Sequence, residues 1–275
     1  MRIFKRIRLP QFNRQTFAFI GVTLVTFGLL TSLFQNEVAA SWADTGWYFR
    51  KKLTIDSAQV SGTSNLTDFP VLVKFSDRQI KDHAQSDGDD LMFTSDDGTT
   101  QLYYEIELYD SSTGILVAWV RIPTLSYDTD TDIYLYYGNP NATNQENVTG
   151  TWNSSYEAVW HMSESSGTRA DSTDGSLDLT ENGTGGVVQV EGISGYAGDF
   201  ELGDSDYLSI ANASAGALNV GDGTDITLTS WVNIETTTGA GFNGIAGKWD
   251  NSSEESYLSH LGDISGNHRA FGRFS

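Results

Sequence analysis

The stretch Ile115–Ile122, ILVAWVRI, gives the clearest indication of the fold. Its apolar side chains follow one another almost without interruption, whereas a strand with one face in water alternates apolar and polar residues. We therefore expect a β-strand that is covered on both of its faces.

The segments on either side of this strand alternate with period two, as half-buried strands do. Lys52–Asp56 and Phe69–Phe75 both alternate, and Pro70 marks the start of the second strand or an edge position. Ile133–Tyr137, IYLYY, closes the block before a strong turn signal at Gly138–Asn141. These patterns predict an all-β domain over residues 46–145.

A second set of predicted strands follows the polar stretch Asn139–Ser155, which has the composition of a linker. Strands at intervals of about a dozen residues, with Gly- and Asp-rich turns between them, are typical of β-sandwiches and barrels. We therefore predict a second all-β domain over 155–275, with strands at Ala158–Met162, Val187–Val190, Tyr207–Ile210, Ile226–Ile234, Gly244–Trp249, Ser256–Leu261 and Ala270–Phe274.

The composition excludes several classes of protein. The chain has 275 residues with 16 Lys and Arg against 36 Asp and Glu, a formal net charge of −20. Such a surface repels nucleic-acid phosphates, so a general nucleic-acid-binding function is excluded. With no Cys in the chain, disulfides, thiolate nucleophiles and zinc–sulfur sites are excluded as well.

The N-terminus has the features of an export signal. Residues 1–40 carry five basic side chains and one acidic one, and the uncharged segment Phe17–Phe34 follows them. Small residues precede Ser41, so we predict signal-peptide cleavage after Ala40. The alternative is an uncleaved membrane anchor, because 18 helical residues span about 27 Å. Both alternatives place the rest of the chain outside the cytoplasm, secreted or at the cell surface.

The first predicted domain resembles the family called domain of unknown function 2341. The family has no known activity that the resemblance could transfer to this chain. The resemblance rests on motifs that occur in order, which are Gly46–Ile55, Leu66–Val73, Asp87–Asp90, Tyr104–Glu107, Ala118–Val120 and Tyr136–Pro140.

The second predicted domain resembles the start of a laminin-G-like, concanavalin-A-like jelly roll. The matching pieces are Val159–Met162, Asp171–Gly175, Asp199–Phe200, Asp206–Leu208 and Leu228–Val232. The resemblance implies a large bacterial or archaeal surface protein that binds glycans or proteins, often with calcium. Because the alternating pattern continues to the last residue, we expect this sequence to be a fragment of a longer protein.

Two glutamates are the first candidates for chemistry. Glu105 and Glu107 lie two apart on a predicted strand, so their side chains are about 7 Å apart, within the range of glycosidase carboxylate pairs. Leu102, Tyr104, Ile106 and Leu108 would share the opposite, buried face. We interpret both glutamates as residues on the solvated face of a half-buried strand, and we predict no catalytic residues.

Histidines and aspartates give no stronger signal. His161 follows Trp160 on a predicted strand, and no local pattern places it near carboxylates or in a metal site. The acidic clusters lack the helix–loop–helix calcium pattern, and Asp is also a common turn residue. The resemblance favours calcium in the second domain over the first, with candidate ligands Asp171, Asp174 and Asp178.

Tryptophans could provide platforms for sugar rings. Trp152, Trp160, Trp231 and Trp249 are the candidates. Trp160 and Trp231 lie in apolar runs and are expected in the core. Trp249, in a turn-like stretch, is the better candidate for exposure.

These patterns favour a non-enzymatic, exported cell-surface protein with a structural or adhesive role and a lectin-like module. Its partner would be a glycan or a surface protein, and only the N-terminal segment would contact the membrane. A secreted glycoside hydrolase and a membrane-tethered envelope component are the alternatives.

Overall fold

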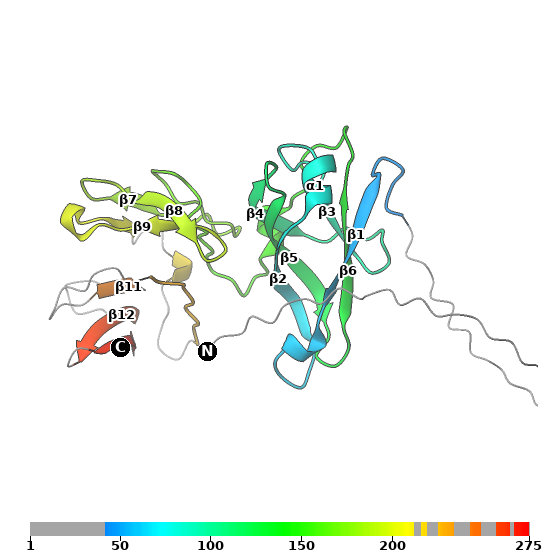
Figure 1. Cartoon of the computed structure of the whole chain (residues 1–275). Coiled ribbons are helices and arrows are strands. Elements are labelled where there is room, and N and C mark those ends of the chain that lie inside the picture. Colours follow the sequence, from blue (N-terminus) through cyan, green and yellow to red (C-terminus); the bar gives the residue numbers. More distant parts are fainter. Residues whose placement is uncertain are drawn as a thin grey trace, which may run out of the picture. The chain divides into compact units, whose positions relative to one another are not determined.

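The structure is a computed structural model that describes residues 42–211, 216–218, 225–233, 243–248, 257–264 and 267–274. The described part is mainly β, with several small antiparallel sheets and a few short helices, as the all-β prediction requires (Figure 1). The predicted cleavage site, Ala40 and Ser41, and the apolar segment 17–34 lie outside the described residues. In the described part, no helix has the length and apolarity needed to cross a membrane.

One three-stranded sheet has the order β2–β5–β4 and contains the strand that the sequence marks most clearly. It consists of β2 (Leu66–Ser76), β5 (Ile115–Leu125) and β4 (Tyr104–Asp110), all antiparallel. Ala118 on one face of β5 and Val117 on the other both have no exposed surface. The predicted coverage of this strand on both faces is therefore confirmed.

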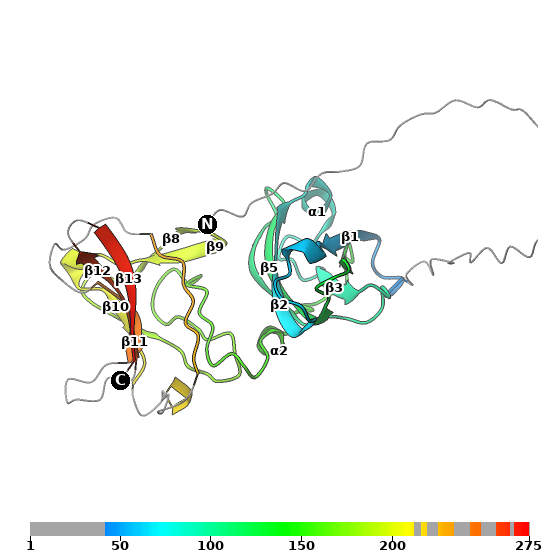
Figure 2. The same ribbon diagram turned by 90° about the horizontal axis from the view of Figure 1, so that it is seen from below.

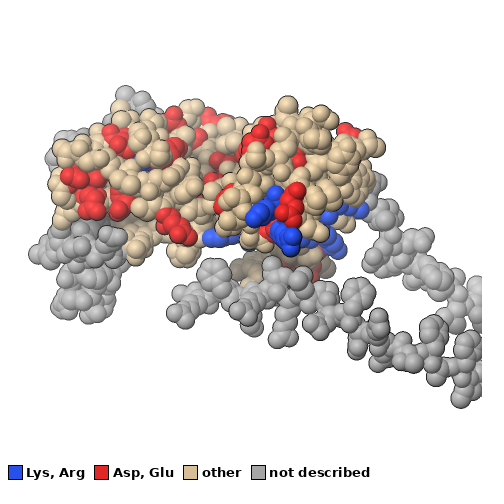
Figure 3. Space-filling view, turned by 45° about the horizontal axis from the view of Figure 1, so that its top comes forward, with Lys and Arg blue, Asp and Glu red and all other residues tan. Residues whose placement is uncertain are grey.

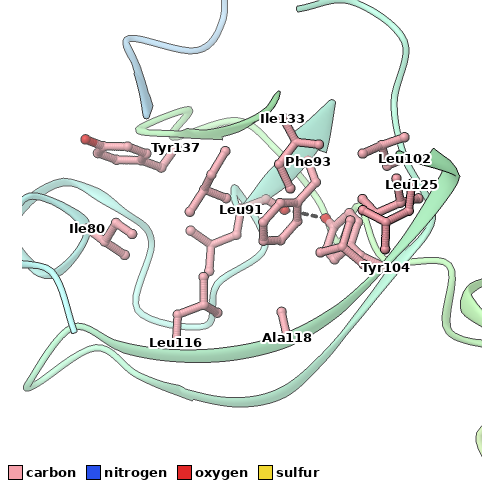
Figure 4. Packing of buried hydrophobic residues seen from close by; sticks show 13 residues of the cluster. Ile80, Leu91, Phe93, Leu102, Tyr104, Leu116, Ala118, Leu125, Ile133 and Tyr137 are labelled. Atoms are coloured by element: carbon pink, nitrogen blue, oxygen red, sulfur yellow. Dashed lines mark hydrogen bonds between the residues drawn. The ribbon is translucent and has the colours of Figure 1, made fainter. Parts of the chain in front are cut away.

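A second three-stranded sheet has the order β1–β6–β3. It consists of β1 (Phe49–Ile55), β6 (Thr131–Tyr137) and β3 (Met92–Ser95), again antiparallel. Residues of both sheets contribute to one buried cluster, part of which is shown in Figure 4. There the hydroxyl of Tyr104 on β4 donates a hydrogen bond to the carbonyl of Leu91, just before β3.

The short helix α1 (Arg78–His83) adds Ile80 to this core. Asp77 caps the helix, since its carboxylate accepts hydrogen bonds from the backbone N–H groups of Gln79 and Ile80. Asp77 also forms an ion pair with Lys51 of β1 at 2.6 Å.

On the face shown in Figure 3, Lys and Arg gather in one area, whereas Asp and Glu are scattered more widely.

Strand β4 contains a β-bulge that the sequence pattern does not reveal. Ile106 pairs with Ala118 and Leu108 with Val117, so Glu107 is the extra residue. The bulge shifts the alternation by one residue, so Tyr109 packs on the core in place of Leu108. The prediction that Leu108 shares the buried face is therefore wrong.

The polar stretch Asn139–Ser155, predicted as a linker, packs against the sheet. The carboxylate of Glu146 accepts a hydrogen bond from the backbone N–H of Ile106 at 2.6 Å, and the N–H of Asn147 donates to the carbonyl of Tyr104. Asn147 then caps the short helix α2 (Val148–Thr151). The polar groups of this stretch therefore form hydrogen bonds with the free edge of β4.

The described strands beyond residue 155 form three separate groups. The short strands β7 (Thr180–Asn182) and β10 (Tyr207–Ser209) pair with each other. Strands β8 (Val188–Gly192) and β9 (Gly195–Asp199) also pair and lie side by side in Figure 2. A three-stranded sheet contains β11 (Asn243–Lys248), β12 (Tyr257–Ile264) and β13 (Asn267–Phe274). These groups confirm strands at five of the seven predicted segments, and the jelly roll stays a prediction.

Two predicted strands of this region are absent from the described residues. Ala158–Met162 is irregular because its polar groups bond to a turn, with the N–H of Val159 donating to the carboxylate of Asp171. Residues 225–233 likewise form no strand. Apolar side chains alone therefore gave the wrong secondary structure at both places.

Candidate functional site: a buried histidine between two glutamates

The site lies on the face of the β2–β5–β4 sheet that is turned away from the Ile80 core cluster. Glu105 pairs in register with Trp119 across β4 and β5, and the bulge places Glu107 beside the same tryptophan. The indole N–H of Trp119 donates to Oε2 of Glu107 at 2.8 Å. Both carboxylates therefore lie on the same face of the sheet.

His161 bridges the two glutamates. Its Nε2 lies 3.1 Å from Oε2 of Glu105 and its Nδ1 3.4 Å from Oε2 of Glu107. The exposed fractions of the three side chains are 11%, 10% and 3% for His161, Glu105 and Glu107. The irregular backbone around residue 161 brings the imidazole to the sheet, where it lies between two buried carboxylates of β4.

Aromatic rings enclose the imidazole. The ring centroid of His161 lies 6.3 Å from that of Trp119 and 5.7 Å from that of Trp152, and the two indoles are 5.4 Å apart. Tyr156 packs edge-on against Trp152 at 5.2 Å. These rings lower the polarity around the imidazole and so strengthen the electrostatic interactions among the charged groups.

Each carboxylate oxygen of the pair has a protein partner. Oε2 of Glu105 accepts from the indole N–H of Trp152 at 2.8 Å, and its Oε1 accepts from the hydroxyl of Ser172 at 2.6 Å. Oε1 of Glu107 accepts from the hydroxyl of Ser194 at 3.4 Å. The hydrogen bonds hold both carboxylates in fixed positions.

The charge on His161 follows from these contacts. Burial by itself disfavours the charged imidazolium, but hydrogen bonds and charge from Glu105 and Glu107 outweigh it and raise the pKa of His161 to about 9. The imidazole is therefore protonated at neutral pH, and both ring nitrogens donate. One cation between two anions is the stable arrangement of this site.

A pocket of about 180 Å³ opens beside the cluster. Its lining is polar and acidic apart from two small apolar side chains. The lining residues are Glu105, Val148, His161, Ser163, Glu164, Ala170, Asp171 and Ser172.

The structure overturns two expectations about these residues. Glu105 and Glu107 do not form a solvated face, because residues after α2 cover them. His161 is not isolated from carboxylates, since its partners lie 56 and 54 positions earlier in the chain. A signal existed in the sequence: a β5 strand covered on both faces implies that its neighbours' outer side chains, Glu105 among them, are covered too.

The predicted calcium ligands do not form a calcium site. The two carboxylate oxygens of Asp171 accept from the backbone N–H groups of Val159, Thr173 and Leu177 and from the hydroxyl of Thr173. Asp178 accepts from the N–H of Asp171. A calcium ion needs six to eight such oxygens at about 2.4 Å, whereas these are used to hold a turn.

Another acidic cluster, Asp87–Asp90, contains a structural carboxylate. Asp90 has no exposed surface, and its carboxylate accepts from the N–H groups of Gln85, Gly138 and Asn139 at 2.7–2.9 Å. Within the described part of the chain, no group of three or more His, Cys, Asp or Glu is arranged to hold a metal ion.

The burial of the candidate tryptophans differs from the prediction. Trp152 is buried at 7% exposure, and Trp160 is half-buried with its indole N–H donating to the carbonyl of Leu177. Trp231, predicted in the core, is 84% exposed because its segment joins no sheet. Trp249 lies outside the described residues.

Residues 87–176 match the family described as Domain of unknown function (DUF2341). The matched range contains Glu105, Glu107, Trp119, Trp152 and His161, so most of the cluster lies inside it. It begins after the motifs at 46–73 and continues through the polar stretch to residue 176. No match to a laminin-G-like or concanavalin-A-like domain was found. No curated protein and no solved structure matches the chain.

Proposed function

We propose that the protein is an exported structural or adhesive component of the cell surface and that its DUF2341 domain performs no catalysis. The basic N-terminus, the apolar segment 17–34 and the acidic remainder of the chain support export.

One observation carries the proposal of a structural role. The carboxylate oxygens of Glu105 and Glu107 are bound by two indole N–H groups, two hydroxyls and His161. A general acid or nucleophile must present a carboxylate to its substrate. Here the oxygens instead join residues 152–194 to the sheet.

Localisation and the mass of the mature protein test the export proposal. We expect the protein at the cell surface or in the medium, with a mass that corresponds to a chain beginning at Ser41. A surface protein that retains residues 1–40 would support the membrane-tethered alternative. A protein retained in the cytoplasm would contradict export in both forms.

A lectin-like ligand-binding role is proposed for the region beyond residue 155, where a jelly roll remains the finer fold hypothesis. The exposure of Trp231 supports it, because an exposed indole is a suitable platform for a sugar ring. A glycan array with and without calcium tests this role. Saturable binding that Trp231→Ala abolishes supports it, and absence of binding under both conditions leaves the structural role alone.

The second candidate is a secreted glycoside hydrolase, which the pocket beside Glu105 favours. Release of reducing sugar from β-glucans is the assay. Activity that is lost in Glu105→Gln but kept in a variant at an exposed glutamate, Glu191→Gln, would overturn the non-catalytic proposal. We expect no release from the unmodified protein.

A further inference from the structure

The His161 cluster connects two parts of the chain that are distant in sequence. On one side are β4 and β5, which supply Glu105, Glu107 and Trp119. On the other side is the covering segment, residues 152–194, which supplies His161 and other contacts. The backbone carbonyl of Ile193 adds a contact by accepting from Nζ of Lys74 on β2 at 2.8 Å.

The covering segment approaches the glutamates closely. Gly195 follows it directly, and a Cβ at that position would lie 2.5 Å from Oε1 of Glu107. Gly195 also has a φ of +108°, which glycine adopts without strain. A side chain at position 195 would therefore collide with the carboxylate of Glu107.

The groups around His161 give it a negative environment. They come from β4, from β5, from the covering segment on both sides of the histidine, and from the turn between β8 and β9. Burial raises the pKa of Tyr156, so this phenol stays neutral. The surrounding groups are Glu105, Glu107, Trp119, Trp152, Tyr156, Glu164, Asp171, Ser172 and Ser194.

We propose that this cluster is an alkaline-released clamp: the imidazolium of His161 holds the covering segment on the β2–β5–β4 sheet, and loss of its proton releases that segment. With the proton gone, one of the two ring nitrogens becomes an acceptor facing a carboxylate. Two buried anions then lie side by side without the cation between them, which favours separation of the covering segment from the sheet.

The direction of the pH effect follows from the raised pKa of His161. The pKa of His161 in the folded protein, about 9, is above the ordinary value of 6.5. The stabilisation is therefore fully present below pH 6.5 and is lost as the pH rises through 9. The clamp is closed at neutral pH and opens on the alkaline side.

Two probes of the full-length protein follow the clamp between pH 6 and pH 10. Tryptophan fluorescence reports the neighbouring indoles of Trp119 and Trp152, whose centroids lie 5.4 Å apart, and limited subtilisin cleavage reports access to residues 152–175. We expect both signals to change together with a midpoint near pH 9. Signals that stay flat to pH 10 would overturn the proposal.

Three variants distinguish the release of the covering segment by His161 from general alkaline unfolding of the protein. Glu107→Gln keeps an acceptor for Trp119 but removes one anion, so its midpoint should move to lower pH. His161→Gln should give the same signals at pH 7 and pH 10. His83→Gln, at an exposed histidine stacked on Phe49, should keep the midpoint near pH 9. An unchanged midpoint in Glu107→Gln, or a remaining step in His161→Gln, would overturn the clamp.

Discussion

The substitution Glu105→Gln tests how much the buried cluster stabilises the fold. The carboxylate is bound by Ser172 at 2.6 Å, Trp152 at 2.8 Å and His161 at 3.1 Å. Glutamine has the same shape, but its NH₂ group faces one of these donors and its neutral charge leaves His161 with one anion. Breaking a buried charged pair costs about 3–5 kcal/mol. Since one acceptor remains, we expect the free energy of unfolding to fall by about 3 kcal/mol.

Urea unfolding followed by tryptophan fluorescence measures this change. With a slope of about 2 kcal/mol per molar urea, a loss of 3 kcal/mol lowers the midpoint by about 1.5 M. Glu191→Gln makes the same chemical change at an exposed position and should shift the midpoint by less than about 0.25 M. If Glu105→Gln shifts the midpoint no more than this control, the buried contacts do not stabilise the protein and the reasoning is refuted.

Three further changes test the fold away from the site. Gly114→Ala should lower the free energy of unfolding by more than about 2 kcal/mol in urea titrations, because its φ is +73° and its Cβ would lie 2.2 Å from the carbonyl oxygen of Asp77. Asp77→Ala should cost about 1 kcal/mol in the same assay, since the N-cap of α1 is lost; an unchanged midpoint would contradict the cap. Asp90→Asn should lower the thermal midpoint measured by circular dichroism, because an amide NH₂ would face backbone N–H donors. Equal melting of this variant and the parent would show that the three N–H groups find other acceptors.

The fold was predictable where local patterns govern it. The apolar run Ile115–Ile122 identified β5 as a strand covered on both faces, and alternation identified β1 and β2. The bulge in β4 was not predictable, because its residues carry no turn signal and the register depends on the partner strand. The exposed Trp231 was mispredicted because apolar alternation reports what a segment could bury and not whether a sheet receives it.

The site was less predictable than the fold. Glu105 and Glu107 were identified as a pair on one strand, but their burial depends on residues about 50 positions further along the chain. His161 stands alone in its local sequence, so no motif could assign it to carboxylates. Such contacts arise only when tertiary structure places the covering segment on the sheet.

The Glu146 side chain has a consequence for how copies of the protein behave beside one another. β4 is the last strand of its sheet, and edge strands recruit strands from other molecules through unpaired backbone groups. Glu146 and Asn147 occupy the N–H of Ile106 and the carbonyl of Tyr104. Where many copies of the protein lie close together, this occupancy would keep them from joining their sheets into aggregates.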